Sequence, residues 1–167
     1  LIESKKHKGA VLTNPNLISP LKKVFHPAML DKNTLKDVFE MRLVLEVGMA
    51  DLIFNRMTIE DIKELEEIVE DEPYHDNNKL FQIDKEVAFH SKLYKVSGNK
   101  VLMDFQELLL PIFQYVHTSG LLNDQSITRE FVSHKELIDL LKTSDATGFR
   151  NGMRKHLDSH YRRLMNR

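Results

Sequence analysis

Apolar residues recur at intervals of three and four from about residue 34 to the end of the chain, and no segment there alternates as a strand would. Short polar, Gly or Pro segments separate the apolar runs. The expected helices span about residues 34–55, 58–71, 80–96, 100–117, 127–141 and 145–165. The pattern predicts an all-α fold, an antiparallel bundle of six or seven helices, because short connections favour antiparallel neighbours.

Capping signals and prolines set the expected limits of the bundle. Thr34 and Thr58 are each followed three residues later by an aspartate, which resembles a capping box. The chain before residue 34 lacks helical periodicity. Residues 5–12 read as a basic turn leading into a short strand, for which the chain offers no evident partner. Residues 13–33, with three prolines, read as a linker.

Composition excludes several classes of protein and site. The 167 residues suffice for one domain with a buried core, and the absence of cysteine excludes disulfides and thiolate metal sites. A net charge of −1 gives no electrostatic argument for nucleic acid or an anionic membrane as partner. No apolar run approaches the roughly 18 residues that span a bilayer. The first residue is Leu rather than Met, as in a fragment, and we expect a cytoplasmic protein because no segment resembles a secretion signal.

Three histidines and one arginine occupy positions where apolar stripes of the predicted helices would bury them. They are His90, His134, His156 and Arg42. Burying such a polar side chain without a partner costs several kcal/mol, so each needs a hydrogen bond or a metal. On converging helices these residues predict a polar pocket inside the bundle.

Glu86 adds a carboxylate to this set. It precedes His90 by four residues and therefore lies beside it on one helix face, whereas Asp84 points about 120° away from His90. One carboxylate and three imidazoles make a set of four oxygen and nitrogen ligands. Zn, Ni, Mn or Fe would accept this set as a divalent ion, and an octahedral ion would keep two positions open.

Other interpretations of the same residues remain open. A lone histidine on an apolar face is more often a hydrogen-bonded core residue than a ligand. Arg42 could pair with Glu46, four residues on. His117 ends a predicted helix, where a cation suits the helix dipole, and it is also a candidate for the ligand pocket.

Motifs of known enzyme classes are absent from the sequence. It contains no HExxH, no Gly-rich phosphate loop and no GxSxG. A metal-dependent hydrolase would need a general base beside the metal-bound water, and the only candidates are Asp84 and Asp104. We therefore expect no catalytic activity, with a metal-dependent hydrolase or lyase acting on small acids as the alternative and a purely structural bundle as a third hypothesis.

Three segments, in order, carry a family resemblance. Glu40-Met-Arg42-Leu-Val-Leu-Glu46 is followed by Glu86-Val-Ala-Phe-His90-Ser-Lys-Leu and Ser97-Gly-Asn99, and then by His134-Lys-Glu-Leu-Ile with Met153-Arg-Lys-His156-Leu157. Together they resemble the effector-binding C-terminal (FCD) domain of the FadR branch of GntR-type bacterial transcriptional regulators. The resemblance covers about residues 34 to 165.

The resemblance implies a helical bundle around a metal held by Asp, His, His and His, with a first-helix Arg that receives a small carboxylate effector. The matching positions are Glu86, His90, His134 and His156 for the metal and Arg42 for the effector. Glu86 stands where the family has Asp, so its longer side chain puts the identity and affinity of the metal in question.

The resemblance also divides the chain and suggests its partners. Residues 1–12 are similar to the end of the wing of a winged-helix DNA-binding domain, residues 13–33 form the linker, and residues 34–167 form the effector-binding domain. The implied protein is a homodimer that binds DNA through the missing N-terminal domain, so this chain alone is not expected to read DNA.

Overall fold

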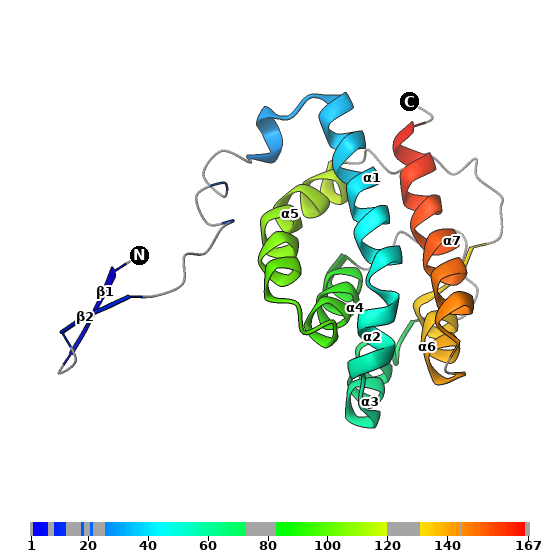
Figure 1. Cartoon of the computed structure of the whole chain (residues 1–167). Helices are drawn as coiled ribbons and strands as arrows, with labels where there is room; N and C mark the ends of the chain where they lie inside the picture. Colours follow the sequence, from blue (N-terminus) through cyan, green and yellow to red (C-terminus); the bar gives the residue numbers. More distant parts are fainter. Residues whose placement is uncertain are drawn as a thin grey trace.

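Seven α-helices follow one another in the part of the chain that the computed structural model describes (Figure 1). That part comprises residues 2–6, 9–12, 18, 21, 26–72, 83–119, 131–143 and 145–165. The helices are α1 (Lys32–Gly48), α2 (Ala50–Arg56), α3 (Ile59–Ile68), α4 (Ile83–Val96), α5 (Lys100–Thr118), α6 (His134–Lys142) and α7 (Ala146–Met165). From residue 26 on, the described residues form no strand, which confirms the expected all-α bundle.

The start of α1 differs from the prediction. Asp31, not Thr34, is the N-cap, and its carboxylate accepts a hydrogen bond from the backbone N–H of Thr34 at 2.7 Å. An aspartate with extended backbone is a preferred N-cap, so α1 begins at Lys32, two residues before Thr34. The predicted single helix to residue 55 also divides at Gly48 and Met49, because glycine weakens helix continuation.

Capping residues explain the starts of α3, α5 and α6. The expected box at Thr58 and Asp61 is complete, and Asn99 caps α5 through two backbone N–H groups. The prediction that the helix over about residues 127–141 already covers residues 131–133 was wrong. Ser133 and Glu136 form a capping box, so α6 begins at His134. Residues 127–130 lie outside the described part of the chain.

The expectation that the N-terminal strand lacks a partner was wrong. β1 (Ile2–Lys5) pairs antiparallel with β2 (Gly9–Leu12), with Ile2 opposite Leu12 and Lys5 opposite Gly9. Gly9 has φ of +70°, a left-handed conformation that glycine adopts without strain at a chain reversal. The expected linker contains a short 3-10 helix, η2 (Pro27–Met29), and most of its other residues lie outside the described part.

Two apolar clusters hold the bundle together. The larger joins α2, α3, α4, α6 and α7 around Ile53, Leu65, Phe89 and Leu137. The smaller joins α1 to α5, with Phe39 packed edge-on against Phe113. α1 also packs along α7, which in turn contacts α6. α1 therefore runs from one cluster to the other, and its buried polar residues lie in between.

Among the described residues, no helix is both long enough and apolar enough to cross a membrane.

Candidate metal centre

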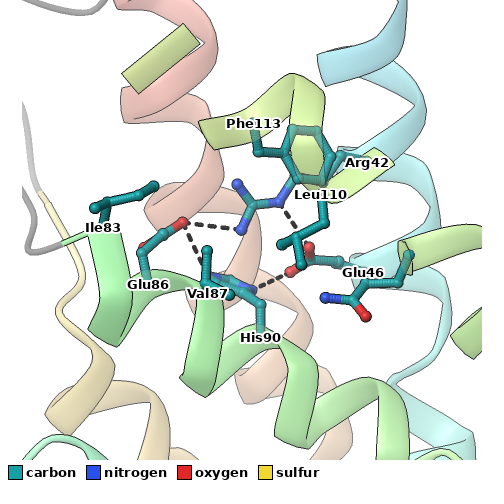
Figure 2. Close-up of a pocket in the computed structure, with 9 residues that line it drawn as sticks. Arg42, Glu46, Ile83, Glu86, Val87, His90, Leu110 and Phe113 are labelled. Carbon is teal, nitrogen blue, oxygen red and sulfur yellow. Dashed lines mark hydrogen bonds and ion pairs between the residues drawn. The ribbon is translucent and has the colours of Figure 1, made fainter. Parts of the chain in front are cut away.

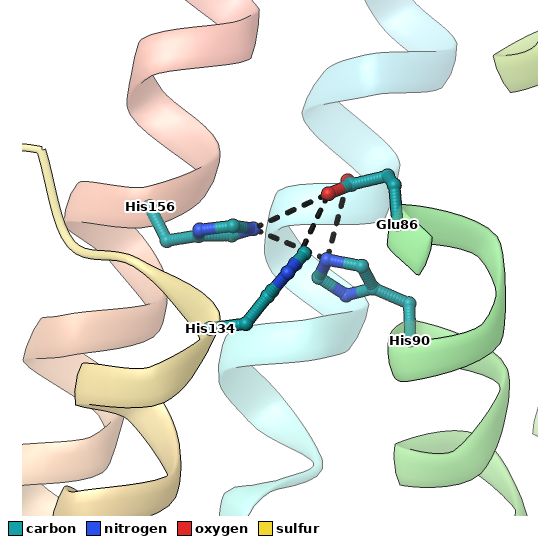
Figure 3. Close-up of side chains that lie close together, drawn as sticks. All are labelled: Glu86, His90, His134 and His156. Carbon is teal, nitrogen blue, oxygen red and sulfur yellow. Dashed lines mark hydrogen bonds and ion pairs between the residues drawn. The ribbon is translucent and has the colours of Figure 1, made fainter. Parts of the chain in front are cut away.

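Four buried side chains from three helices point toward one another inside the bundle (Figure 3). Glu86 and His90 come from α4, His134 is the first residue of α6, and His156 comes from α7. One ligand atom of each residue lies within 4.8 Å of those of the other three. The structure thus brings together the four residues that the sequence singled out as metal ligands.

All three histidines turn Nε2 toward the Glu86 carboxylate. The distances to its nearer oxygen are 3.2 Å from His90, 3.1 Å from His134 and 3.7 Å from His156. The Nε2 atoms of His90 and His156 are 3.2 Å apart. Two nitrogens each about 2.1 Å from one ion, at roughly 90–110° to each other, would lie about 3.0–3.4 Å apart. The spacing of these nitrogens therefore suits ligands of a single ion.

The opposite nitrogen of each imidazole is held by an outer acceptor. Nδ1 of His90 bonds with Glu46, Nδ1 of His134 lies 2.9 Å from Glu72, and Nδ1 of His156 lies 2.8 Å from the carbonyl oxygen of Val132. Carbonyl and ionised carboxylate oxygens only accept hydrogen bonds, so Nδ1 carries a proton in each case. Whenever an imidazole held in this way is neutral, it presents the lone pair of Nε2 to the centre, as metal-binding histidines do.

Packing fixes the ring of His134 further. The Phe89 ring lies against it with centroids 4.2 Å apart. The capping box at Ser133 sets the start of α6 and thereby the position of the His134 backbone. An imidazole with a stacked ring on one face and a hydrogen bond at Nδ1 has little freedom to turn away from the centre.

Burial and neighbouring charges shift the pKa values of three residues in the cluster. Burial alone would lower the pKa of His134, but its hydrogen bonds with Glu72 and Glu86 prevail and raise it to about 9. Burial and the positive charge on His134 lower the pKa of His156 to about 3. Burial would raise the pKa of Glu46, yet the charges of Arg42 and His90 lower it to about 2. Glu46 is thus ionised although it is fully buried.

Arg42 joins the cluster from α1. Its Nε donates to Glu46 at 2.7 Å and its Nη2 donates to Glu86 at 2.8 Å. The guanidinium carbon lies 4.7 Å from the centroid of the Phe113 ring. The expected alternative of a pair with Glu46 is therefore present, and the same side chain also reaches Glu86. Nη1 of Arg42 is buried and has no hydrogen-bond partner in the part of the chain that the structure describes.

A small pocket lies beside Arg42 and Glu86, between α1, α4 and α5 (Figure 2). It encloses about 270 Å³, including space open to solvent. Its lining combines polar and apolar side chains, namely Arg42, Glu46, Glu86, His90 and Gln106 with Ile83, Val87, Leu110 and Phe113. The pocket therefore places a cation next to the proposed metal ligands, where an anion could contact both.

Three other candidate residues from the sequence do not line this pocket. His117 lies in the last turn of α5 and neither lines the pocket nor belongs to the four converging residues. Asp84 is exposed, and Asp104 pairs with Lys100 at 3.1 Å. Neither aspartate lines the pocket.

Two residues of the centre were missed in the sequence. Glu46 was considered only as a partner of Arg42, although its position on the same stripe as the arginine indicates burial. Glu72 follows α3 in a bend, where no periodicity marks it. Only the tertiary fold brings it to His134, 62 residues later in the chain.

Comparisons with known proteins agree with this architecture. The FCD domain family matches residues 37–159, which is well over half of the chain. No curated protein matches. The solved structure of Streptococcus agalactiae GntR is similar in fold, with a TM-score of 0.62 at 21% sequence identity, over 96% of this chain and 74% of that one. The chain belongs to the FCD domain family.

Proposed function

We propose that this chain is the ligand-sensing domain of a DNA-binding transcriptional regulator and that it binds a small carboxylate effector at a metal ion. Membership of the FCD family supports a regulatory domain of this kind. Glu86, His90, His134 and His156 would hold the ion, and Arg42 would bind the carboxylate of the effector.

The observation that carries the metal proposal is the orientation of the three imidazoles. Each directs Nε2 inward and has Nδ1 held by an outer acceptor, as described above. A set of three nitrogens and one carboxylate suits zinc, nickel, manganese or iron as a divalent ion. Such an ion, when bound, supplies a Lewis-acidic position at which an acid oxygen can exchange.

The observation that carries the effector proposal is the position of Arg42 beside the pocket. A guanidinium can bind a carboxylate through two parallel hydrogen bonds. Within the described residues Nη1 of Arg42 has no acceptor for its two N–H groups, whereas Nε and one N–H of Nη2 donate to Glu46 and Glu86. An acid bound through both Nη atoms would share Nη2 with Glu86 and compete with it for the positive charge of the guanidinium, which gives the effector a means to change the centre.

Regulation would follow from this competition. An effector changes the relative population of two states only by binding them with different affinity. Moving Arg42 away from Glu86 would alter how α1 and α4 pack, since these residues tie the two helices together. In a homodimer such a change would reposition two DNA-binding domains that precede this domain. The β1–β2 hairpin at the start of the chain supports the wing interpretation.

The same arrangement argues against the hydrolase or lyase alternative. The two aspartates considered as general bases are either exposed or paired with a lysine, and neither faces the pocket. A sensor needs reversible binding at the metal and no proton acceptor beside it.

A titration of the full-length regulator separates these functions. Its affinity for its own promoter DNA is measured by mobility shift against a panel of sugar acids, hydroxy acids, dicarboxylates and amino acids. We expect one acid to change DNA binding, and only when metal is present. Steady turnover of an acid without any effect on DNA binding would favour the enzyme instead.

A further inference from the structure

Glu46 forms hydrogen bonds both with Arg42 and with His90, one of the proposed metal ligands (Figure 2). It is fully buried in the last turn of α1, three residues before the buried Met49 that ends the helix. One carboxylate oxygen accepts from Nε of Arg42 at 2.7 Å, and the other bonds with Nδ1 of His90. Each carboxylate oxygen therefore has its own partner, Arg42 for one and His90 for the other.

An ionised carboxylate in this place determines the tautomer of His90. The carboxylate can only accept, so the shared proton lies on Nδ1 of His90 and the lone pair lies on Nε2. Nε2 is the atom that faces Glu86 and His156. If the proton moved to Nε2, that nitrogen could not bind a metal.

We propose that Glu46 is a positioning residue of the metal centre, which holds His90 in the tautomer that presents Nε2 to the ion. This inference rests on the proposed metal site, but the tautomer it predicts is a property of the metal-free protein as well. The outer acceptors of the other two histidines, Glu72 and the Val132 carbonyl, serve the same purpose from other elements.

Glutamine is an informative replacement because it keeps the shape of Glu46 and removes one acceptor. Its side chain has one carbonyl oxygen and one NH₂ group, so it can accept from Arg42 or from His90 but not from both. The arginine is always charged and buried, and it will retain the carbonyl oxygen. The NH₂ group then faces Nδ1 of His90, which must accept, and the proton moves to Nε2.

Two measurements on the full chain test the proposal. In ¹⁵N-labelled, metal-free protein, long-range ¹H–¹⁵N spectra recorded where the imidazoles are neutral distinguish the two tautomers. We expect His90 to carry its proton on Nδ1 in the wild type and on Nε2 in Glu46→Gln. By competition with a chelator, Glu46→Gln should bind zinc about 10- to 100-fold more weakly than the wild type, as is typical when an outer partner of a ligand is lost.

Two variants serve as controls. Glu72→Gln removes the same charge from the acceptor of His134 and should leave the tautomer of His90 unchanged. Glu46→Asp keeps the charge and should retain the wild-type tautomer of His90, and it also shows whether loss of folding explains the glutamine variant. An unchanged His90 tautomer in folded Glu46→Gln would overturn the proposal. If wild-type protein binds no zinc, the metal function fails, while the spectra still decide the role of Glu46.

Discussion

Replacing Asp61 by asparagine should lower the free energy of unfolding by about 2 kcal/mol at neutral pH. Asp61 accepts a hydrogen bond from the buried Lys92 at 2.7 Å and thereby ties α3 to α4, the helix that carries two of the proposed metal ligands. It also caps α3 through Thr58. Asparagine has one carbonyl oxygen, so it can accept from Lys92 or at the cap but not at both, and the substitution removes the charge together with one of these hydrogen bonds.

The magnitude follows from the pKa of Asp61. The hydrogen bond from Lys92 and the one from the Thr58 backbone lower this pKa from 3.8 to about 2. Each pKa unit corresponds to about 1.4 kcal/mol, which gives about 2 kcal/mol. The side chain is 21% exposed, so screening by solvent makes this an upper value. Because the folded-state pKa is lowered, the contribution is present above about pH 4 and is lost as the pH falls toward 2.

Urea unfolding followed by circular dichroism measures this contribution. A chelator is included, since a bound metal would add its own stability. We expect a difference of about 2 kcal/mol between wild type and Asp61→Asn at pH 7, falling to about half at pH 3. Glu64→Gln is the matched control, because Glu64 bonds with the same lysine but is 54% exposed, and it should change stability by less than about 0.5 kcal/mol. Equal losses in both variants, or a difference that does not change with pH, would refute the reasoning.

Three further predictions concern single side chains. Tyr94→Phe should leave the free energy of unfolding within about 0.5 kcal/mol of wild type, or raise it, because the buried hydroxyl has no hydrogen-bond partner in the described residues; a clear loss by urea unfolding would contradict this. Gly48→Ala should stabilise by about 0.5–1 kcal/mol, since a Cβ there meets nothing within 4 Å, whereas Gly152→Ala should destabilise by about 1–3 kcal/mol, since its Cβ would lie 2.5 Å from Leu140. The opposite order in thermal unfolding would show that α6 and α7 pack less closely there. Arg42→Lys should keep the metal content of the wild type and weaken binding of the effector acid, because lysine cannot form the two-pronged hydrogen bond; equal affinity by calorimetry would remove Arg42 from the pocket.

The residues of the centre could be predicted where periodicity marks them. His90, His134 and His156 interrupt apolar stripes, and Glu86 lies one turn from His90, so burial on helices was enough to select them. The structure buries all four together. Their role as ligands stays a prediction until metal is measured.

The outer acceptors could not be predicted in the same way. Glu46 bonds with a histidine 44 residues away, and Glu72 bonds with one 62 residues away. Such contacts depend on how helices and bends pack, and local spacing carries no information on them. Only the hydrogen bond between Arg42 and Glu46, four residues apart on α1, follows from helix geometry.

The start of a helix could be predicted from the sequence where only one capping signal was present. Thr58 with Asp61 gave the start of α3 correctly. At α1, Asp31 and Thr34 are both good caps, and the earlier carboxylate prevails. At α6, the apolar run extends before Ser133, but the capping box at that residue sets the start.

Metal content tests the central claim most directly. The full chain is dialysed against a chelator-free buffer after purification and its metals are measured by mass spectrometry, for wild type, His134→Ala, His156→Ala and the exposed control His26→Ala. The account predicts about one divalent ion per chain in wild type and in His26→Ala, and a strong loss in the two buried-histidine variants, with circular dichroism confirming that each is folded. Metal content that is unchanged in folded His134→Ala or His156→Ala would contradict it.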